Sequence, residues 1–227
     1  MVTGRRGGIG GSALRLSAEA GVSLIELLVA LVVSLLVIGG ATVLAGQMQL
    51  SYRRQLDAAT AQQEARAAVE LIQRFLRGAG NNPYRMLIVP CPAAATPFLP
   101  IRMDPDGDLI HDDIRIQMDA NPVDSLIGGT AGACSQAGED VTISHDAVNE
   151  TITFLDNNLG GAAVPRTDGV ITSLRFVYRT SSRVITTVPN SVSFIETQVT
   201  ARSTMVEEGT AAPLMQTVVS EIRVRVR

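Results

Sequence analysis

The sequence predicts an α+β protein in which a long N-terminal helix packs on a C-terminal antiparallel β-sheet domain. Two patterns lead to this prediction. Residues 22–80 combine a continuous apolar run with apolar residues recurring every three or four positions, which is typical of helices. Residues 81–227 contain segments of alternating apolar and polar residues between turn-forming ones, which is typical of strands with one covered face.

The first half of the predicted helix is apolar enough to cross a membrane. The 20 residues from Leu27 to Gly46 carry no charge, and at about 1.5 Å per residue they suffice for one span. We place the transmembrane part at about residues 22–46. A secretory signal peptide is the alternative, but the run is long for one and no small-x-small cleavage site follows it cleanly.

The orientation of this span follows from the residues before it. Residues 1–21 are rich in glycine and contain Arg5, Arg6 and Arg15. By the positive-inside rule this segment stays cytoplasmic, so everything after the span is exported. Gly39 and Gly40 mark a weak point in the helix or a site where a neighbouring helix packs closely.

The second half of the helix is predicted to be amphipathic and to end near residue 80. Its apolar residues are Leu50, Leu56, Ala65, Ala68, Val69, Ile72, Phe75 and Leu76. Gly78, Gly80 and Pro83 end the pattern, because glycine adopts the left-handed cap and proline cannot continue a helix. The stripe needs a partner surface, most simply the chain's own C-terminal domain.

Six segments after the helix read as strands: 113–118, 140–144, 150–155, 169–178, 191–202 and 217–227. Residues 141–155 are expected to form a hairpin. In the last segment, Ile222, Val224 and Val226 fall on one face, and Arg223, Arg225 and Arg227 fall on the other. This alternation predicts an antiparallel sheet with one wet face, and the amphipathic half of the helix is the obvious cover for the other face.

Two cysteines, Cys91 and Cys134, lie in the exported part of the chain. An even number of cysteines in an oxidising compartment favours a disulfide, although two buried free thiols remain the alternative. The chain has no C-x-x-C motif, so redox catalysis is not expected.

Composition and motifs give no sign of an enzyme or a nucleic-acid-binding protein. The 227 residues carry a net charge of −3 without a basic cluster, and the arginines of the last strand are expected to line a wet sheet face. No G-x-S-x-G, P-loop or H-E-x-x-H motif occurs. His111 and His145 each precede an aspartate, but two histidines are too few for a metal phosphohydrolase.

One acidic loop is a candidate for calcium. Asp104, Asp106 and Asp108 alternate and Asp112 follows, which supplies the carboxylate oxygens that Ca²⁺ prefers. The loop is no EF-hand, because Arg115 stands at the twelfth position, where a bidentate glutamate is required. A looser calcium loop and a solvated acidic turn both remain open. Ca²⁺ is therefore the one candidate cofactor, and no cofactor is required.

The stretch GVSLIELLVAL, which begins at Gly21, resembles the signal of type IV prepilins and pseudopilins. Val22 stands where that superfamily usually has phenylalanine. The following segment QLSYRRQLDAATAQQEARAAVELIQRFLRGAGNNPY resembles the PilW-type minor pilins. The acidic turn, the strands GEDVTIS and GVITSLRFVY and the arginine-alternating C-terminus are similar to the same group, so the resemblance extends over most of the chain.

The resemblance implies a processed structural subunit rather than a catalyst. A prepilin peptidase would cut after Gly21, remove residues 1–21 as a leader and methylate the new amine of Val22. Glu26 would then set the register between subunits. An ionised side chain in lipid costs about 2.5–3.5 kcal/mol, and the amine of Val22 is the obvious counter-charge. Snorkelling of Glu26 to the cytoplasmic interface is the alternative.

The resemblance also implies partners and a location. The subunit would sit in the bacterial inner membrane with its C-terminal domain in the periplasm, and would later be pulled into a helical pilus. Its partners would be other major and minor pilins, the prepilin peptidase and an inner-membrane assembly platform. A pseudopilin of type II secretion is the nearest alternative. A membrane-anchored periplasmic enzyme or calcium-binding module is the alternative from another class.

Overall fold

The computed structural model describes residues 21–91, 96–121, 126–130, 133–206 and 212–224. The predicted leader therefore lies outside the described residues except for Gly21, as do Arg225, Val226 and Arg227. The chain divides into two compact units, Met1–Leu50 and Ser51–Arg227. This division falls within helix α1 (Leu24–Gly78), which belongs to both units.

Ser23 starts α1. Its backbone oxygen accepts hydrogen bonds from the backbone N–H groups of Glu26 and Leu27 at 3.0 and 3.1 Å, and its Oγ accepts one from Ile25 at 3.3 Å. Ser23 is thus the N-cap, and Glu26 is the acidic residue of the first turn, which is the Ser-x-x-Glu spacing of a capping box. A carboxylate at this end of a helix is favoured by the helix dipole.

In the first unit, α1 exposes apolar side chains on all sides. It contains an 18-residue window with a mean hydropathy of 2.8, none of which is buried, so it is long and apolar enough to span a membrane. Gly39 and Gly40 do not interrupt the helix. A Cβ at either glycine would meet no atom within 4 Å, so this part of the chain gives neither glycine a close neighbour.

In the second unit, one face of α1 is buried. Its buried residues are Ala61, Ala65, Ala68, Val69, Ile72 and Leu76. The predicted amphipathic stripe is therefore confirmed for its C-terminal part. Leu50 and Leu56, which the same spacing includes, are 39% and 56% exposed, so the domain covers the stripe only from Ala61 onward.

The predicted end of the helix is also confirmed. The last turn closes with a hydrogen bond from the backbone N–H of Ala79 to the oxygen of Phe75 at 3.1 Å. Gly80 then adopts a φ of 76°, which only glycine tolerates at little cost. Its N–H donates to the oxygen of Gln117 at 3.1 Å, which ties the end of α1 to the sheet.

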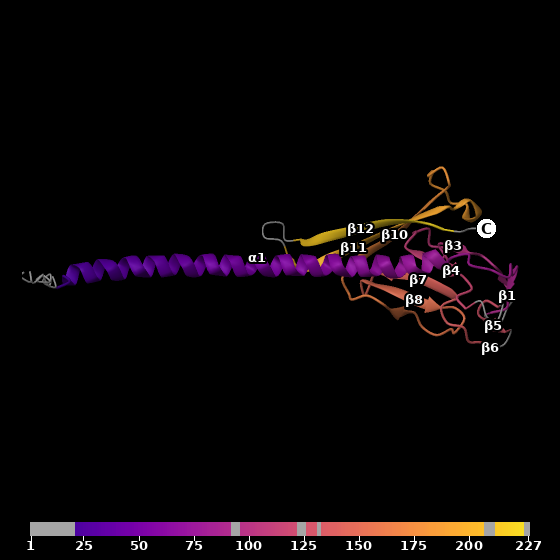
Figure 1. The fold of residues 1–227 in the computed structure, drawn as a ribbon, viewed down its shortest axis with the longest axis horizontal. Helices are drawn as coiled ribbons and strands as arrows, with labels where there is room; N and C mark the ends of the chain where they lie inside the picture. Colours follow the sequence, from indigo (N-terminus) through magenta and orange to yellow (C-terminus); the bar gives the residue numbers. More distant parts are fainter. Residues whose placement is uncertain (1–20, 92–95, 122–125, 131–132, 207–211, 225–227) are drawn as a thin grey trace, which may run out of the picture. The chain divides into compact units, whose positions relative to one another are not determined.

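Two antiparallel sheets account for most of the strands (Figure 1). The five-stranded sheet has the order β3-β4-β7-β8-β9, with β3 at Ile101–Met103, β4 at Asp113–Gln117, β7 at Asp140–Asp146, β8 at Thr151–Asp156 and β9 at Val164–Pro165. The three-stranded sheet has the order β10-β11-β12, with β10 at Ile171–Arg179, β11 at Phe194–Val206 and β12 at Pro213–Arg223. Each of the six predicted segments contains a strand, although residues 225–227 of the last one lie outside the described residues, and β7 and β8 form the expected hairpin.

Short elements complete the fold. Two further pairs, β1 (Ile88–Val89) with β2 (Thr96–Pro97) and β5 (Gly129–Thr130) with β6 (Ala133–Cys134), consist of two-residue strands. One 3-10 turn, η1 (Pro189–Ser191), precedes β11.

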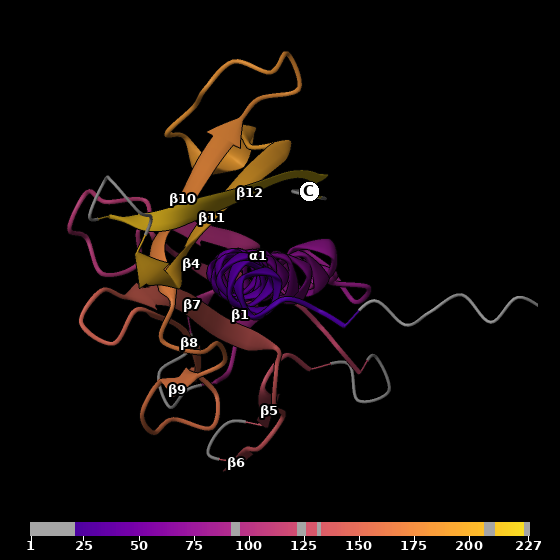
Figure 2. The same ribbon diagram turned by 90° about the vertical axis from the view of Figure 1, so that its left-hand side faces the viewer.

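The hydrophobic core lies between the sheets and the buried face of α1 (Figure 2). Ile114, Ile143 and Phe154 contribute from the five-stranded sheet, and Phe176 and Ile195 contribute from the other. The rings of Phe75 on α1 and Phe154 on β8 lie 5.3 Å apart. The expectation that the amphipathic half of the helix covers the sheet is therefore confirmed, and the fold is α+β.

Candidate functional sites

The predicted cleavage site lies in an exposed segment at the start of the described chain. Gly21 and Val22 precede α1 without regular structure. A Cβ on Gly21 would meet nothing within 4 Å, and Val22 is 71% exposed. Within the first unit, both residues are therefore exposed, and Glu26 is exposed about one helical turn further along the chain.

The predicted acidic loop connects β3 and β4 and brings three of its four aspartates together. One carboxylate oxygen each from Asp104, Asp106 and Asp108 lie within 4.8 Å of one another. Asp104 organises the loop, since its Oδ1 accepts hydrogen bonds from the N–H groups of Gly107 and Asp108 at 2.9 and 3.1 Å, and its Oδ2 accepts one from Leu109 at 3.0 Å.

Asp112, the fourth predicted member, is not part of this close group. It lies on the chain just before β4, and it is half-buried. Burial raises its pKa, and the negative charge of Asp108 raises it further, while the nearby His145 opposes the shift. Asp112 therefore interacts electrostatically with Asp108, but its carboxylate does not belong to the group of three.

Sequence reasoning missed Asp113, the first residue of β4. Its side chain is buried, with 2% of the residue exposed, and its Oδ2 accepts a hydrogen bond from the N–H of Asp106 at 3.2 Å. Burial raises the pKa of Asp113 to about 7, and the charges of Asp106 and Asp104 act in the same direction. The alternation of β4 places Asp113 on the face opposite Ile114, so the sequence gives no signal of its burial.

Two aromatic side chains, the buried Tyr178 and the partly buried His111, lie next to these aspartates. The rings of His111 and Tyr178 meet edge to face with centroids 5.7 Å apart. Burial raises the pKa of Tyr178, as do the charges of Asp113 and Asp104. Within the described ranges, no hydrogen-bond partner reaches the Tyr178 hydroxyl, Nδ1 of His111 or Oδ1 of Asp113. The other histidine, His145, is used structurally, because its Nε2 lies 2.9 Å from the backbone oxygen of Ile171.

The disulfide expected from the sequence is present. Cys91 and Cys134 are bonded, with their Cα atoms 5.6 Å apart and a sequence separation of 43. Gly128, beside this bond, has a φ of 84°, and a Cβ there would lie 2.7 Å from the Cβ of Cys91. The chain around the disulfide is therefore too tightly packed to accept a larger residue at position 128.

A buried carboxylate holds the same region in place. Glu139, which is 1% exposed, accepts hydrogen bonds from the N–H groups of Ala120, Asn121 and Gly128 at 3.0, 3.2 and 2.7 Å. Burial raises the pKa of Glu139, although these three bonds oppose the shift. Since the donors are backbone groups of two separate segments, Glu139 is a structural clamp.

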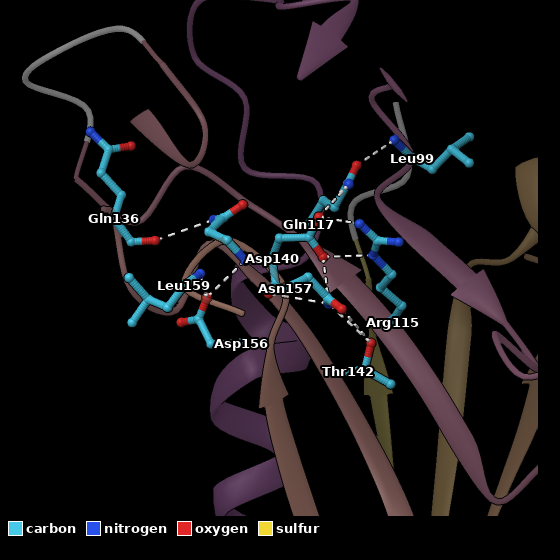
Figure 3. Close-up of polar contacts among 10 residues, drawn as sticks. Leu99, Arg115, Gln117, Gln136, Asp140, Thr142, Asp156, Asn157 and Leu159 are labelled. Carbon is cyan, nitrogen blue, oxygen red and sulfur yellow. Dashed lines mark hydrogen bonds and ion pairs between the residues drawn. The ribbon is translucent and has the colours of Figure 1, made fainter. Parts of the chain in front are cut away.

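A second buried carboxylate, Asp140, lies at the centre of a polar network (Figure 3). Asp140 is fully buried and accepts hydrogen bonds from Nε and Nη2 of Arg115 at 2.7 and 2.6 Å, from Gln117 at 2.7 Å and from Asn157 at 2.9 Å. Because both oxygens are engaged, Asp140 is poorly placed to act as a general base. The network joins β4, β7 and the chain after β8.

A wide, open groove of about 1060 Å³ lies at the C-terminal end of α1. Its lining includes Arg77, Asn81, Ser193 and Arg223. The described lining contains no carboxylate, histidine or cysteine, so it brings no acid–base pair together.

Comparisons with protein-family models, curated proteins and solved structures find no match for this chain.

Proposed function

We propose that the chain is a minor pilin, an assembly-priming subunit of a type IV pilus that a prepilin peptidase processes. One observation supports this proposal most directly. The Gly21–Val22 bond lies one turn ahead of Glu26, at the start of a single helix that is apolar and exposed first and is covered by antiparallel sheet later. This combination matches what the prepilin resemblance requires of a subunit.

The two environments of α1 fit a protein that changes surroundings. In the first unit, the helix exposes apolar residues on all sides, from Leu24 to Leu44. Such a surface needs lipid or other helices as cover. In an inner membrane, lipid would provide it. In a filament, the equivalent helices of other pilins would replace the lipid, while the periplasmic domain would remain folded on the second half of α1.

Glu26 is the charged residue at the start of this apolar surface. After cleavage, the amine of Val22 would be its nearest counter-charge, on the same chain or on a neighbouring subunit. A buried ion pair stabilises little by itself, but removing one partner leaves an uncompensated charge, at a cost of about 3–5 kcal/mol. A wrongly registered subunit would incur that cost, so the pair would select the correct register.

Mass spectrometry of the N-terminus tests the proposal. The chain should be purified from cells that contain a prepilin peptidase, and its first residue should be Val22 carrying a methyl group. In Gly21→Leu, a large side chain at the cut should block processing and retain residues 1–21. Gly39→Ala, a matched change at an open helical position, should leave processing intact. A wild-type chain that still begins with Met1 would contradict the proposal.

A pseudopilin of type II secretion would undergo the same processing, so a deletion strain must separate the two. Loss of surface pili with normal secretion supports the minor pilin, and loss of secretion with normal pili supports the pseudopilin. A membrane-anchored periplasmic enzyme or calcium-binding module would keep residues 1–21 attached, and its deletion would change neither pili nor secretion.

A further inference from the structure

We infer that the acidic loop, residues 104–108, forms a calcium-binding site through Asp104, Asp106 and Asp108, with the buried carboxylate of Asp113 next to it. This inference goes beyond the proposed function and does not depend on it, since the site lies wholly in the β-rich unit.

The spacing of the three loop carboxylates suits one calcium ion. Ca²⁺ binds oxygen ligands at about 2.3–2.6 Å, so two oxygens on one ion are separated by at most about 5 Å. The closest oxygens of Asp104, Asp106 and Asp108 satisfy this limit, because all lie within 4.8 Å of one another. These three carboxylates can therefore contact the same ion without moving the backbone far.

The hydrogen bonds of the loop leave oxygens for an ion. Oδ1 of Asp106 accepts from the N–H of Asp108 at 3.1 Å, and Oδ1 of Asp108 accepts from the N–H of Ile110 at 2.7 Å. The Oδ2 atom of each residue stays outside these two bonds. The backbone thus orients both side chains, and these two bonds use only one oxygen of each.

Asp113 is the independent observation that points to a ligand. It comes from β4 rather than from the loop, and only 2% of it is exposed. Its carboxylate faces the loop, because Oδ2 accepts the N–H of Asp106 at 3.2 Å, while Oδ1 has no hydrogen-bond partner among the described residues. A buried carboxylate that is incompletely paired is costly, and a cation beneath the loop would remove that cost.

Arg115, the arginine on the same strand, does not form its ion pair with Asp113. Arg115 forms its ion pair with Asp140, at 2.6 Å. Arg115 therefore does not neutralise the charge of the loop. Asp112 adds a further negative charge next to Asp108, which increases the attraction for a divalent ion.

The ligand chemistry favours Ca²⁺ over other divalent ions. The three loop groups that lie within 4.8 Å of one another are carboxylates, as is Asp113 beside them, whereas zinc prefers histidine and cysteine. Ca²⁺ accepts six to eight oxygens in irregular geometry and completes its shell with backbone oxygens and water, whereas Mg²⁺ demands a near-ideal octahedron. An exposed loop that leaves part of the calcium shell to backbone oxygens and water is typical of low-affinity calcium sites, with a Kd of about 0.1–1 mM.

Calorimetric titration of CaCl₂ into the full-length chain in detergent, after treatment with EDTA, tests the site. We expect one ion per chain, with a Kd of about 0.1–1 mM, and weaker binding of Mg²⁺. At 5 mM CaCl₂ the melting temperature should rise by about 3–5 °C. Asp106→Asn and Asp108→Asn, both at exposed positions, should weaken binding about tenfold or more, whereas Asp168→Asn, at an exposed turn elsewhere, should bind as the parent does.

Asp113→Asn separates a site built on β4 from a solvated acidic turn. It should keep or raise the melting temperature in EDTA, because it removes a carboxyl group whose charged form burial disfavours, and it should lose the rise in calcium. Unchanged calcium binding in Asp113→Asn would overturn the assignment of that residue. If 5 mM CaCl₂ gave neither saturable heat nor a change in melting temperature with the parent chain, the loop would be an acidic turn and the inference would be wrong.

Discussion

Asp57 of α1 accepts a hydrogen bond from the backbone N–H of Met205 at 2.8 Å, although 148 positions separate the two residues. Its other oxygen accepts the hydroxyl of Thr204 at 2.7 Å. Both donors belong to the C-terminal part of β11, so one carboxylate fastens the end of that strand to the helix. This contact lies just before Ala61, where the buried stripe of α1 begins.

Asp57→Ala should lower the free energy of unfolding of the β-rich unit by about 1 kcal/mol, because it removes two hydrogen bonds to a charged but partly solvated acceptor. Denaturation of the full chain in detergent measures the change. Glu70→Gln, at an exposed position on the same helix, should change stability by less than about 0.5 kcal/mol. Equal effects of the two substitutions would show that the contact with β11 contributes nothing specific.

The contribution of Asp57 should depend on pH. The hydrogen bonds from Thr204 and from Met205 lower its pKa below the ordinary value of 3.8. A lowered pKa in the folded state means that the unfolded state binds the proton more readily. The stabilisation is therefore complete well above pH 4 and is lost as the pH falls through the folded pKa. The stability difference between the parent and Asp57→Asn should shrink over this acidic range and stay constant from pH 6 to 8.

Reduction of the Cys91–Cys134 disulfide should destabilise the β-rich unit. On the chain-entropy model, a loop of this length contributes about 4 kcal/mol. Cys91→Ser/Cys134→Ser should therefore lower the midpoint of denaturation strongly, and the parent treated with dithiothreitol should behave in the same way. A parent chain that keeps its midpoint in reductant would show that the bond does not support the fold.

Gly128→Ala should destabilise the same region without touching a cysteine. The added methyl would lie 2.6 Å from Oδ1 of Asn158 and 2.7 Å from the Cβ of Cys91, in a backbone conformation with a φ of 84°. We expect a loss of about 2–4 kcal/mol from overpacking and backbone strain. Gly138→Ala is the matched control, since Gly138 also has a positive φ of 81° but open space around it. A similar loss in both variants would assign the effect to φ alone.

Glu26 allows a test of charge against capping. Glu26→Ala should leave the chain in the membrane but impair the assembly of pili. Because Glu26 also occupies the third helical position after the N-cap Ser23, loss of the cap could produce the same defect. Glu26→Gln keeps a capping side chain and removes only the charge. If ion pairing with the amine of Val22 is the role, Gln should fail as Ala does, and normal piliation in Glu26→Gln would refute the pairing.

Local patterns in the sequence predicted α1, its end near Gly78, and the long strands. Ile114 and Ile116 on β4 illustrate the reason. Their alternation with polar residues predicts that both face the core, and both are buried, although the sequence does not say which element covers them. Short elements left no such signal. β5 and β6 have two residues each, and their pairing depends on a disulfide and on Glu139, which are contacts between distant parts of the chain.

The candidate sites divide in the same way. The Gly21–Val22 bond, Glu26 and the loop aspartates are predicted from the sequence because each belongs to a contiguous motif. Asp113 and Asp57 were not, since each looks like an ordinary solvated acid in sequence. Their roles arise from burial under a loop and from donors on a distant strand, which only the folded chain brings together.

The position of β12 has a consequence for the order of events during synthesis. β12 pairs with β11. Val218 and Ile222 of β12 pack against the hydrophobic core, and Val224, just after the strand, belongs to this core together with residues of α1. The ribosome makes these residues after every other described strand, and α1 before all of them. The part of the core that these residues complete therefore stays uncovered until almost all of the described strands have been made, and during that interval a chaperone or the membrane surface has the opportunity to hold it.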